Sequence, residues 1–219
     1  MCGRFGYTLI TLKDGTQKWI RLVQELPSVD LQRIETLFKT LSGTEIFPGA
    51  KAPILYQTEN KVNITYANWG VKPDWSPKVI FNTRVEKLFS SNFWGNLIYS
   101  QRCIVPASYF LEWKSENGTK VRYRIQNQTE PNMSFAGIWG GQEDTTWFTI
   151  LTQEGNELMK EIHNTGGNQG RQPVQIKEEN ISSWLNPKLS KQKEIEGLLT
   201  TYPSTSILAI PETDQLSLF

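Results

Sequence analysis

The chain has little of the material that metal sites and disulfide frameworks require. Its 219 residues include two cysteines, Cys2 and Cys103, and one histidine, His163. Two thiols and one imidazole can supply neither a disulfide framework nor a four-ligand zinc site. We therefore expect a reducing compartment and no metal or other cofactor.

Long apolar runs and a charge excess are also missing. No stretch approaches 18 consecutive apolar residues, and no basic segment followed by an apolar one opens the chain. These absences argue against a membrane span and a secretory signal, so we expect a cytoplasmic protein with no membrane partner. The net charge is only +1. Because nucleic-acid-binding domains often have a pI above about 9, any basic surface must be local.

Short runs rich in β-branched and aromatic residues fill the middle of the chain. The segment 52–70 predicts a hairpin with its turn at Glu59 and Asn60. Further strands are predicted in KVIFNTR, RCIVPASYFLEWK, KVRYRIQ, SFAGIWGG and TWFTILT. Helical spacing occurs over 29–41, where Asp30 is the expected cap, and helical signals return in 85–97, 154–163 and 190–199.

This order of elements predicts an α+β fold. We expect a curved, largely antiparallel β-sheet or barrel as the core, with peripheral helices. Length is compatible with one domain, which we place at 1–210, followed by a C-terminal tail at 211–219.

The N-terminal sequence MCGRF places a thiol one residue after the initiator methionine. An aminopeptidase that removes Met1 requires a small second side chain, and cysteine qualifies. The mature chain would then begin with Cys2, which carries both a free α-amine and a thiol. One residue would thus present two nucleophiles.

Three other side chains are candidates for proton transfer or orientation, and each has an ordinary structural alternative. His163 ends a helical stretch, where the helix dipole favours the imidazolium, but a lone histidine is more often a surface or capping residue. Glu112 in YFLEWK is either outward-facing or buried with a raised pKa. Asn82 in FNTR is either a turn residue or an amide that orients a reacting group.

These residues lie within motifs that, taken in order, resemble the SOS-response-associated peptidase family, whose members crosslink to abasic sites in single-stranded DNA. The motifs are MCGRF, WGVKPDW (69–75), FNTRVEKL (81–88), RCIVPASYFLEWK (102–114), FAGIWGG (135–141) and FTILTQEGN with MKEIHN (148–164). The resemblance extends from Cys2 to about Trp184. One departure is IHNTGGNQGRQP, which inserts a Gly-rich loop before Arg171 and puts Gln172 where the family has methionine.

The resemblance implies roles position by position. Cys2, Asn82, Glu112 and His163 match the catalytic residues of the family. Arg4 and Arg84 fall where the family contacts DNA phosphates, and Pro48 and Trp75 fall where apolar side chains meet bases. The implied activity is an abasic-site crosslinking, lyase-type reaction that joins Cys2 to the sugar aldehyde as a thiazolidine, together with self-removal of Met1. The implied partner is single-stranded DNA that contains abasic sites.

Two other functions remain open from the residues. Glutamine amidotransferases of the N-terminal-nucleophile type also begin with MCG, although the FNTR and FLEW segments do not fit them. A non-catalytic module that binds single-stranded DNA, with an incidental Cys2, is the second alternative. A covalent DNA adduct would distinguish crosslinking from simple binding.

The C-terminal residues form a separate motif. Gln215, Leu216, Leu218 and Phe219 resemble the short peptide with which bacterial proteins bind the replication sliding clamp. An extended peptide of this kind uses apolar anchors and one directional amide hydrogen bond. The alternative is that these side chains complete a strand or cover the core of the domain itself.

Overall fold

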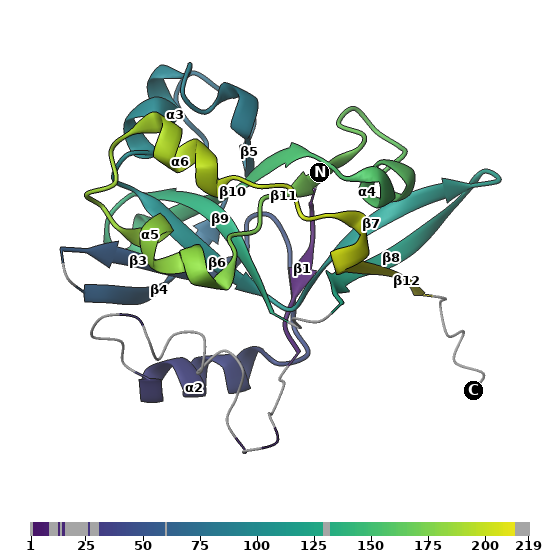
Figure 1. Ribbon diagram of the computed structural model, residues 1–219, viewed down its shortest axis with the longest axis horizontal. Helices are drawn as coiled ribbons and strands as arrows, with labels where there is room; N and C mark the ends of the chain where they lie inside the picture. Colours follow the sequence, from purple (N-terminus) through teal and green to yellow (C-terminus); the bar gives the residue numbers. More distant parts are fainter. Residues whose placement is uncertain are drawn as a thin grey trace.

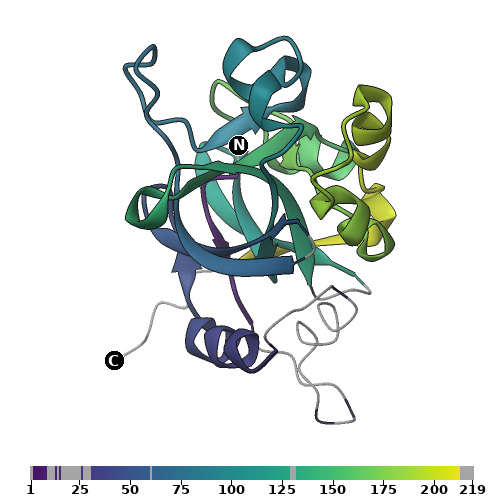
Figure 2. The same ribbon diagram turned by 90° about the vertical axis from the view of Figure 1, so that its left-hand side faces the viewer.

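The larger of two sheets closes into a barrel. The computed structural model describes residues 2–8, 13, 15, 26, 31–59, 61–128 and 132–212. This sheet has the order β11-β10-β4-β3-β6-β9, and β9 also pairs with β10, so the sheet closes on itself (Figure 2). Its strands are β3 (Lys51–Thr58), β4 (Lys61–Trp69), β5 (Asn82–Arg84), β6 (Arg102–Ala107), β9 (Met133–Gly140), β10 (Trp147–Glu154) and β11 (Arg171–Pro173).

The second sheet lies against one end of this barrel. Its order is β12-β8-β7-β1-β2, with all neighbours antiparallel. The strands are β1 (Phe5–Gly6), β2 (Glu45–Ile46), β7 (Tyr109–Glu116), β8 (Thr119–Asn127) and β12 (Ile207–Glu212). Only Ser108 separates β6 from β7, so one extended segment contributes to both sheets. The predicted α+β class with a largely antiparallel core is confirmed, with β4 and β5 as parallel neighbours of β10.

Strand β1 carries an aromatic side chain into the centre of the barrel. Phe5 is fully buried and makes edge contacts with Trp69 and Phe135 at centroid distances of 4.9 and 6.2 Å. Edge-to-face aromatic pairs contribute about 0.5–1.5 kcal/mol beyond their buried area. Figure 2 shows β1, in purple, inside the ring of strands. This packing fixes the chain three residues after Cys2.

The helices are short and lie outside the sheets (Figure 1). They are α2 (Leu31–Leu41), α3 (Asn92–Leu97), α4 (Glu157–Ile162), α5 (Ile181–Leu185) and α6 (Gln192–Leu198), with 3-10 turns η1 (Val85–Lys87), η2 (Glu143–Thr145), η3 (Glu178–Asn180) and η4 (Ser204–Ser206). Side chains start two of them: Ser91 Oγ accepts from the Trp94 amide, and Asn156 Oδ1 from the Met159 amide. None of the helices in the described residues has the length and apolar character to cross a bilayer.

Several predicted strands and helices differ from the observed ones in their boundaries. The helical signal over 85–97 resolves into η1 and α3, because Ser91 starts a new helix. The run KVIFNTR forms a strand only at Asn82–Arg84, and RCIVPASYFLEWK forms two strands. The 52–70 hairpin is confirmed, with Glu59 at a φ of 51° in its turn. Asp30 and Asn60 lie outside the described residues.

Candidate functional site

Cys2 lies beside β7 because the antiparallel pairing of β1 continues toward the N-terminus. The Leu111 amide donates to the Arg4 carbonyl at 2.9 Å, so the residues before Arg4 run alongside Glu112. The Cys2 side chain is fully buried, and its Sγ donates to the Arg4 carbonyl at 3.5 Å. Burial, reinforced by the negative charge of Glu112, raises the pKa of the Cys2 thiol well above its usual range.

Asn82 holds the backbone of Cys2 directly. Its Nδ2 donates to the Cys2 carbonyl at 2.8 Å. The neighbours of Asn82 are fixed: Trp69 Nε1 donates to the Phe81 carbonyl at 2.8 Å, and the Thr83 and Thr149 hydroxyls are 2.8 Å apart. The Asn82 Oδ1 atom is buried and has no hydrogen-bond partner among the residues that the structure describes. Because a buried acceptor without a partner is costly, Oδ1 is an available site for a donor next to Cys2.

Glu112 and His163 form a buried pair that links β7 to the end of α4. His163 Nε2 is 3.9 Å from Glu112 Oε2, and the two side chains are only 8% and 5% exposed. Asn164 fixes this approach, because its amide group exchanges hydrogen bonds of 2.8 and 3.1 Å with the backbone of Ser115 on β7. Lys114 adds a 2.6 Å ion pair with Glu161 of α4.

Both members of this pair favour their neutral forms. Burial raises the pKa of Glu112 to about 7, and burial lowers the pKa of His163 to about 4. The expectation that the helix terminus favours a His163 imidazolium is therefore wrong, because desolvation outweighs the dipole of a six-residue helix. His163 Nδ1 lies 3.3 Å from both the amide nitrogen and the carbonyl oxygen of Arg171, and Nε2 is the ring nitrogen that faces Glu112.

Arg4 lies between two aromatic rings near the surface. Its guanidinium carbon is 4.6 Å from the Phe47 ring centroid and 5.3 Å from that of Trp113. Phe47 is 43% exposed, and the adjoining Pro48 is also exposed. These cation–π contacts hold the guanidinium, and its Nη1 atom also makes a 3.8 Å ion pair with Glu45 Oε2. The predicted phosphate and base contacts Arg4 and Pro48 thus share one surface.

Arg84, two residues after Asn82 on β5, lines a polar cavity of about 610 Å³. The inserted loop lines this cavity, and Arg84 Nη2 donates to Asn168 Oδ1 of that loop. Arg171 makes a bidentate ion pair with Glu86 at 3.0 and 2.8 Å and donates to the Thr152 carbonyl at 2.7 Å. The cations on this side are therefore already bonded within the chain.

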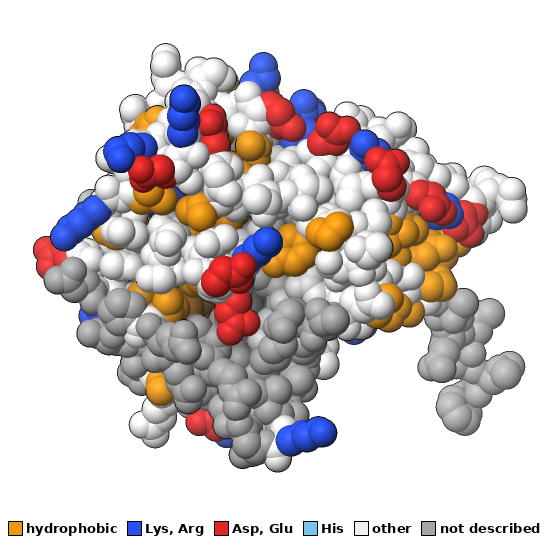
Figure 3. All heavy atoms as spheres, viewed as in Figure 1, with side chains coloured by type: hydrophobic (Ala, Val, Ile, Leu, Met, Phe, Trp, Pro, Cys, Tyr) orange, Lys and Arg blue, Asp and Glu red, His pale blue; other side chains and the backbone are white. Residues whose placement is uncertain are grey.

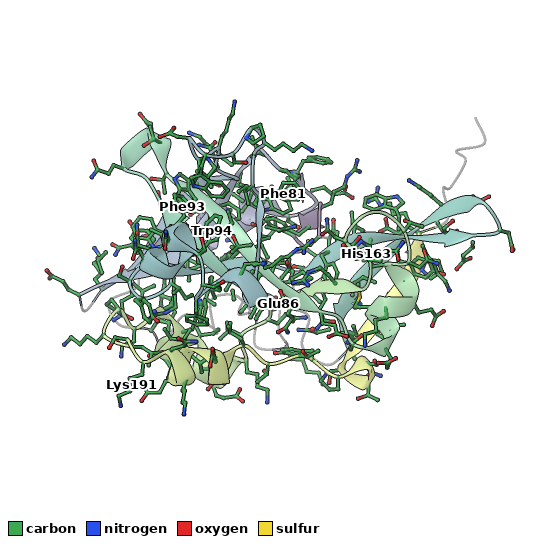
Figure 4. The ribbon with its side chains drawn as sticks, turned by 90° about the horizontal axis from the view of Figure 1, so that it is seen from above. Phe81, Glu86, Phe93, Trp94, His163 and Lys191 are labelled. Atoms are coloured by element: carbon green, nitrogen blue, oxygen red, sulfur yellow. The ribbon has the colours of Figure 1, made fainter. Side chains whose placement is uncertain are left out.

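Trp75 lies apart from these groups. It is 60% exposed and contacts Phe93 of α3 at a centroid distance of 5.9 Å. Figure 4 shows Phe93 and Trp94 on one side of Phe81 and Glu86, with His163 on the other. The structure brings Cys2, Asn82, Glu112 and His163 together, whereas Trp75 belongs to a separate aromatic surface.

Several neighbours of the site were not predicted. Trp113, Glu86 and Thr152 contact candidate residues, yet nothing in their own segments distinguishes them from ordinary strand or turn residues. The position of Trp113 directly after Glu112 was the available signal for a surface beside the site. The clamp-motif residues Gln215, Leu216, Leu218 and Phe219 lie outside the described residues. Within the described residues, no group of three His, Cys, Asp or Glu side chains is arranged to hold a metal ion.

The charges on the face seen in Figure 3 are mixed. Acidic and basic side chains alternate along its upper edge, and apolar groups are exposed between them. This face therefore carries no large patch of one sign, in agreement with the net charge of +1. An anionic ligand on this face would therefore have to bind individual cations.

Comparison with known proteins identifies the family of this chain. The profile of a family described as SOS response associated peptidase (SRAP) matches residues 1–216, so the chain belongs to this family. The abasic site processing protein YoqW of Bacillus subtilis is 29% identical over 220 residues, covering 95% of this chain and 91% of YoqW. The abasic site processing protein YoaM of the same organism is 27% identical over 95% of this chain and 89% of YoaM.

Solved structures share the fold. A crystal structure of a protein from Bacteroides thetaiotaomicron is 25% identical, with a TM-score of 0.74 over 97% of this chain and 93% of the other. A protein from Bordetella bronchiseptica has a TM-score of 0.71 at 17% identity, over 97% of this chain and 100% of the other. Membership of the SRAP family decides against the amidotransferase alternative.

Proposed function

We propose that the chain, once Met1 is removed, forms a covalent crosslink between Cys2 and the aldehyde of an abasic site in single-stranded DNA. The observation that carries the proposal is the placement of Cys2 between Asn82 and the buried Glu112–His163 pair. The names of the relatives YoqW and YoaM support abasic-site processing as the general activity.

The first step is imine formation at the α-amine of Cys2. An α-amine with a pKa of about 7.7–8.0 is partly neutral near pH 7.5, so it can attack the aldehyde carbon of the opened sugar. The buried Oδ1 of Asn82 is available to accept an N–H of this amine. Glu112, with its pKa near 7, is available as the acid that protonates the departing hydroxyl, which leaves as water.

The second step closes the thiazolidine ring. The Cys2 thiol adds to the imine carbon, a carbon–sulfur bond forms, and the thiol proton passes to the imine nitrogen. Because the amine and the thiol belong to one residue, this step is intramolecular. It avoids the entropic cost of bringing a second reactant to the site. Glu112, now ionised, is available to accept the thiol proton and return it to the imine nitrogen, and His163 Nε2 lies 3.9 Å from the same carboxylate. The imine is also the intermediate from which a lyase-type strand cleavage would proceed.

Self-removal of Met1 is a further part of the proposal. The peptide bond before Cys2 is hydrolysed by water, which frees methionine and exposes the α-amine. Glu112 and His163, which lie next to Cys2, are the groups available for proton transfer in this hydrolysis as well.

Single-stranded DNA would be held by separate phosphate and base contacts. Arg4 is positioned by Phe47 and Trp113 to bind a phosphate, and Arg84 can do so by releasing Asn168. Pro48 and Trp75 supply exposed apolar surface for bases. We also propose that Gln215, Leu216, Leu218 and Phe219 tether the protein to the replication sliding clamp. Such a tether would raise the effective concentration of the protein near the DNA that the clamp encircles.

The test is crosslinking to an abasic single-stranded oligonucleotide, followed on a denaturing gel. Cys2→Ala should abolish the heat-stable adduct, whereas Cys103→Ala, which removes the other buried thiol, should leave it. Glu112→Gln and His163→Ala should slow the reaction at least tenfold while circular dichroism stays unchanged. Equal yields of heat-stable adduct from the parent and Cys2→Ala would refute the proposed function.

A further inference from the structure

Glu212, the last residue that the structure describes, is fixed on the second sheet by two arginines. Its carboxylate forms ion pairs of 2.7 Å with the Nε atoms of both Arg122 and Arg124 on β8. Arg122 also pairs with Glu45 of β2, so the ion pairs form a network rather than isolated contacts. Every residue of β12 pairs with β8 as well. The chain therefore leaves the second sheet from a fixed point.

The sliding-clamp motif begins very close to this fixed point. Only Thr213 and Asp214 separate Glu212 from Gln215. An extended chain advances about 3.3–3.6 Å per residue, so Gln215 lies at most about 10–11 Å from Glu212. A clamp that binds Gln215 must bring its surface within that distance. With so short a linker, the end of β12 lies against the clamp.

The strand that carries Glu212 exposes two large apolar side chains. Leu208 is 37% exposed and Ile210 is 42% exposed, whereas Ile207 on the opposite face is buried. Because side chains alternate along a strand, Leu208 and Ile210 share the face of Glu212. β12 is an edge strand of its sheet (Figure 1). At about 3.3 Å per residue, Ile210 lies about 7 Å and Leu208 about 13 Å from Glu212 along the strand.

The cations beside these side chains are already compensated. Arg124 lies opposite Ile210 in the β8–β12 register and pairs with Glu212. Its guanidinium carbon is also 3.9 Å from the ring centroid of Tyr109. Nucleic acid binds through cations that are free to neutralise phosphates, whereas a protein surface gains from apolar area whose neighbouring charges are paired. This face therefore suits a protein partner rather than a DNA strand.

We propose that Leu208 and Ile210 form a second contact surface for the sliding clamp, beside the groove that binds residues 215–219. This inference rests on the proposed tether and adds that the domain docks on the clamp in one orientation. The same sheet face carries Arg4, because Glu45 pairs with both Arg4 and Arg122. Docking through β12 therefore fixes where the Arg4 surface lies relative to the clamp.

Isothermal titration calorimetry of the full chain with the purified cognate clamp tests the second contact. Leu208→Thr/Ile210→Thr keeps strand-favouring residues but removes most of the apolar surface. It should weaken binding about tenfold, which corresponds to about 1.4 kcal/mol. Val79→Thr is the matched control, because Val79 is 51% exposed but lies between β4 and β5, and it should bind as the parent does. Both variants should crosslink to a free abasic oligonucleotide with the parental yield.

Two further measurements leave β12 unchanged. A synthetic peptide of residues 213–219 lacks the second contact, so it should bind the clamp about tenfold more weakly than the full chain. A flexible Gly/Ser segment of six residues inserted after Thr213 should weaken the full chain about fivefold, because a longer linker lowers the effective concentration of the β12 face at the clamp.

The outcomes separate docking from tethering. Equal affinities of the double variant and the parent, or of the peptide and the full chain, would overturn the docking surface and leave the tether intact. Absence of clamp binding by both the peptide and the full chain would refute the tether and the docking surface together, while the crosslinking assay still tests the reaction at Cys2. A parent that sediments as a dimer, with a double variant that sediments as a monomer, would assign this face to a second copy of the chain and overturn the proposal.

Discussion

Two buried side chains with opposite pKa shifts set the chemistry of the site at the residue scale. Glu112 retains its proton up to about pH 7, and His163 remains neutral down to about pH 4. Near pH 7 the pair therefore consists of a neutral imidazole and a carboxyl group that is close to the midpoint of its titration. A carboxyl poised in this way can both donate and accept a proton in one reaction cycle.

The same shifts predict how Glu112→Gln alters stability with pH. The pKa of Glu112 is 4.5 ordinarily and about 7 in the folded chain. Between these two pH values the folded chain binds more protons at Glu112 than the unfolded chain does. The contribution of Glu112 to the free energy of unfolding therefore falls as pH rises. His163 has the opposite effect between about pH 4 and its ordinary 6.5. Glu112→Gln removes only the first effect, so the free energy of unfolding of the variant minus that of the parent should increase from pH 5 to pH 8, by on the order of 2 kcal/mol.

Urea denaturation of both proteins at the two pH values measures this difference. Asn63→Ala is the control, because it changes no titratable group and its side-chain hydrogen bonds lie in the β3–β4 hairpin. Its stability difference from the parent should stay nearly constant with pH. A difference for Glu112→Gln that is also constant would mean that Glu112 titrates normally in the folded chain.

Sequence motifs identified the candidate residues but not their ionisation. Cys2, Asn82, Glu112 and His163 stand in separate motifs that the fold brings together. The charge state of His163 was predicted wrongly, because its burial depends on β7 and the 164–171 segment rather than on its own helix. Long-range packing of this kind leaves no local signal.

At the scale of elements, the site depends on how α4 is attached to β7. The Asn164 side chain bridges to Ser115, and this bridge holds His163 against Glu112. Asn164→Ala should slow crosslinking about three- to tenfold, because loss of the bridge loosens the His163–Glu112 approach. Circular dichroism should remain that of the parent, since the bridge is only partly buried.

Rates measured with the abasic single-stranded oligonucleotide test this effect. Asn63→Ala is the matched control, because Asn63 also bonds with its side chain to neighbouring groups but lies in the β3–β4 hairpin. A parental rate for Asn164→Ala would show that β7 and α4 hold the pair without this bridge. Asn164→Asp, which keeps the acceptor for the Ser115 amide, should retain part of the rate.

Individual strands and helices were predicted better than the pairing between strands. Alternation and turn residues predicted the β3–β4 hairpin, whose two strands are close in sequence. The parallel pairing of β10 with β4 and β5 was not predicted, because strands more than 60 residues apart leave no periodic signal. It is this pairing that places Asn82 beside Cys2.

At the scale of the whole molecule, the barrel forms the scaffold of the site. Strand β1 of the second sheet positions the N-terminal segment against it. A curved sheet or barrel was expected, but its closure through β9 and β10 could not be foreseen from single strands. The last described strand, β12, continues to Glu212 and pairs with β8. Residues 211 and 212, expected at the start of the tail, therefore belong to this strand.

The C-terminal motif gives a prediction that is independent of the site. Deleting Gln215 to Phe219 should abolish binding to the cognate sliding clamp and leave crosslinking to a free abasic oligonucleotide unchanged. Isothermal calorimetry with the purified clamp measures the first effect, and the gel assay measures the second. No heat from the parent chain, or a deletion that unfolds the protein, would favour the alternative in which these side chains pack on their own domain.

The central claim is tested most directly by the intact mass of the protein after incubation with abasic single-stranded DNA, without any reducing agent. A thiazolidine through Cys2 predicts one species whose mass equals the chain lacking Met1 plus the oligonucleotide minus one water, and this species should survive heating. An adduct that appears only after borohydride treatment, or one that forms equally with Cys2→Ala, would contradict the account, because a simple imine needs no thiol.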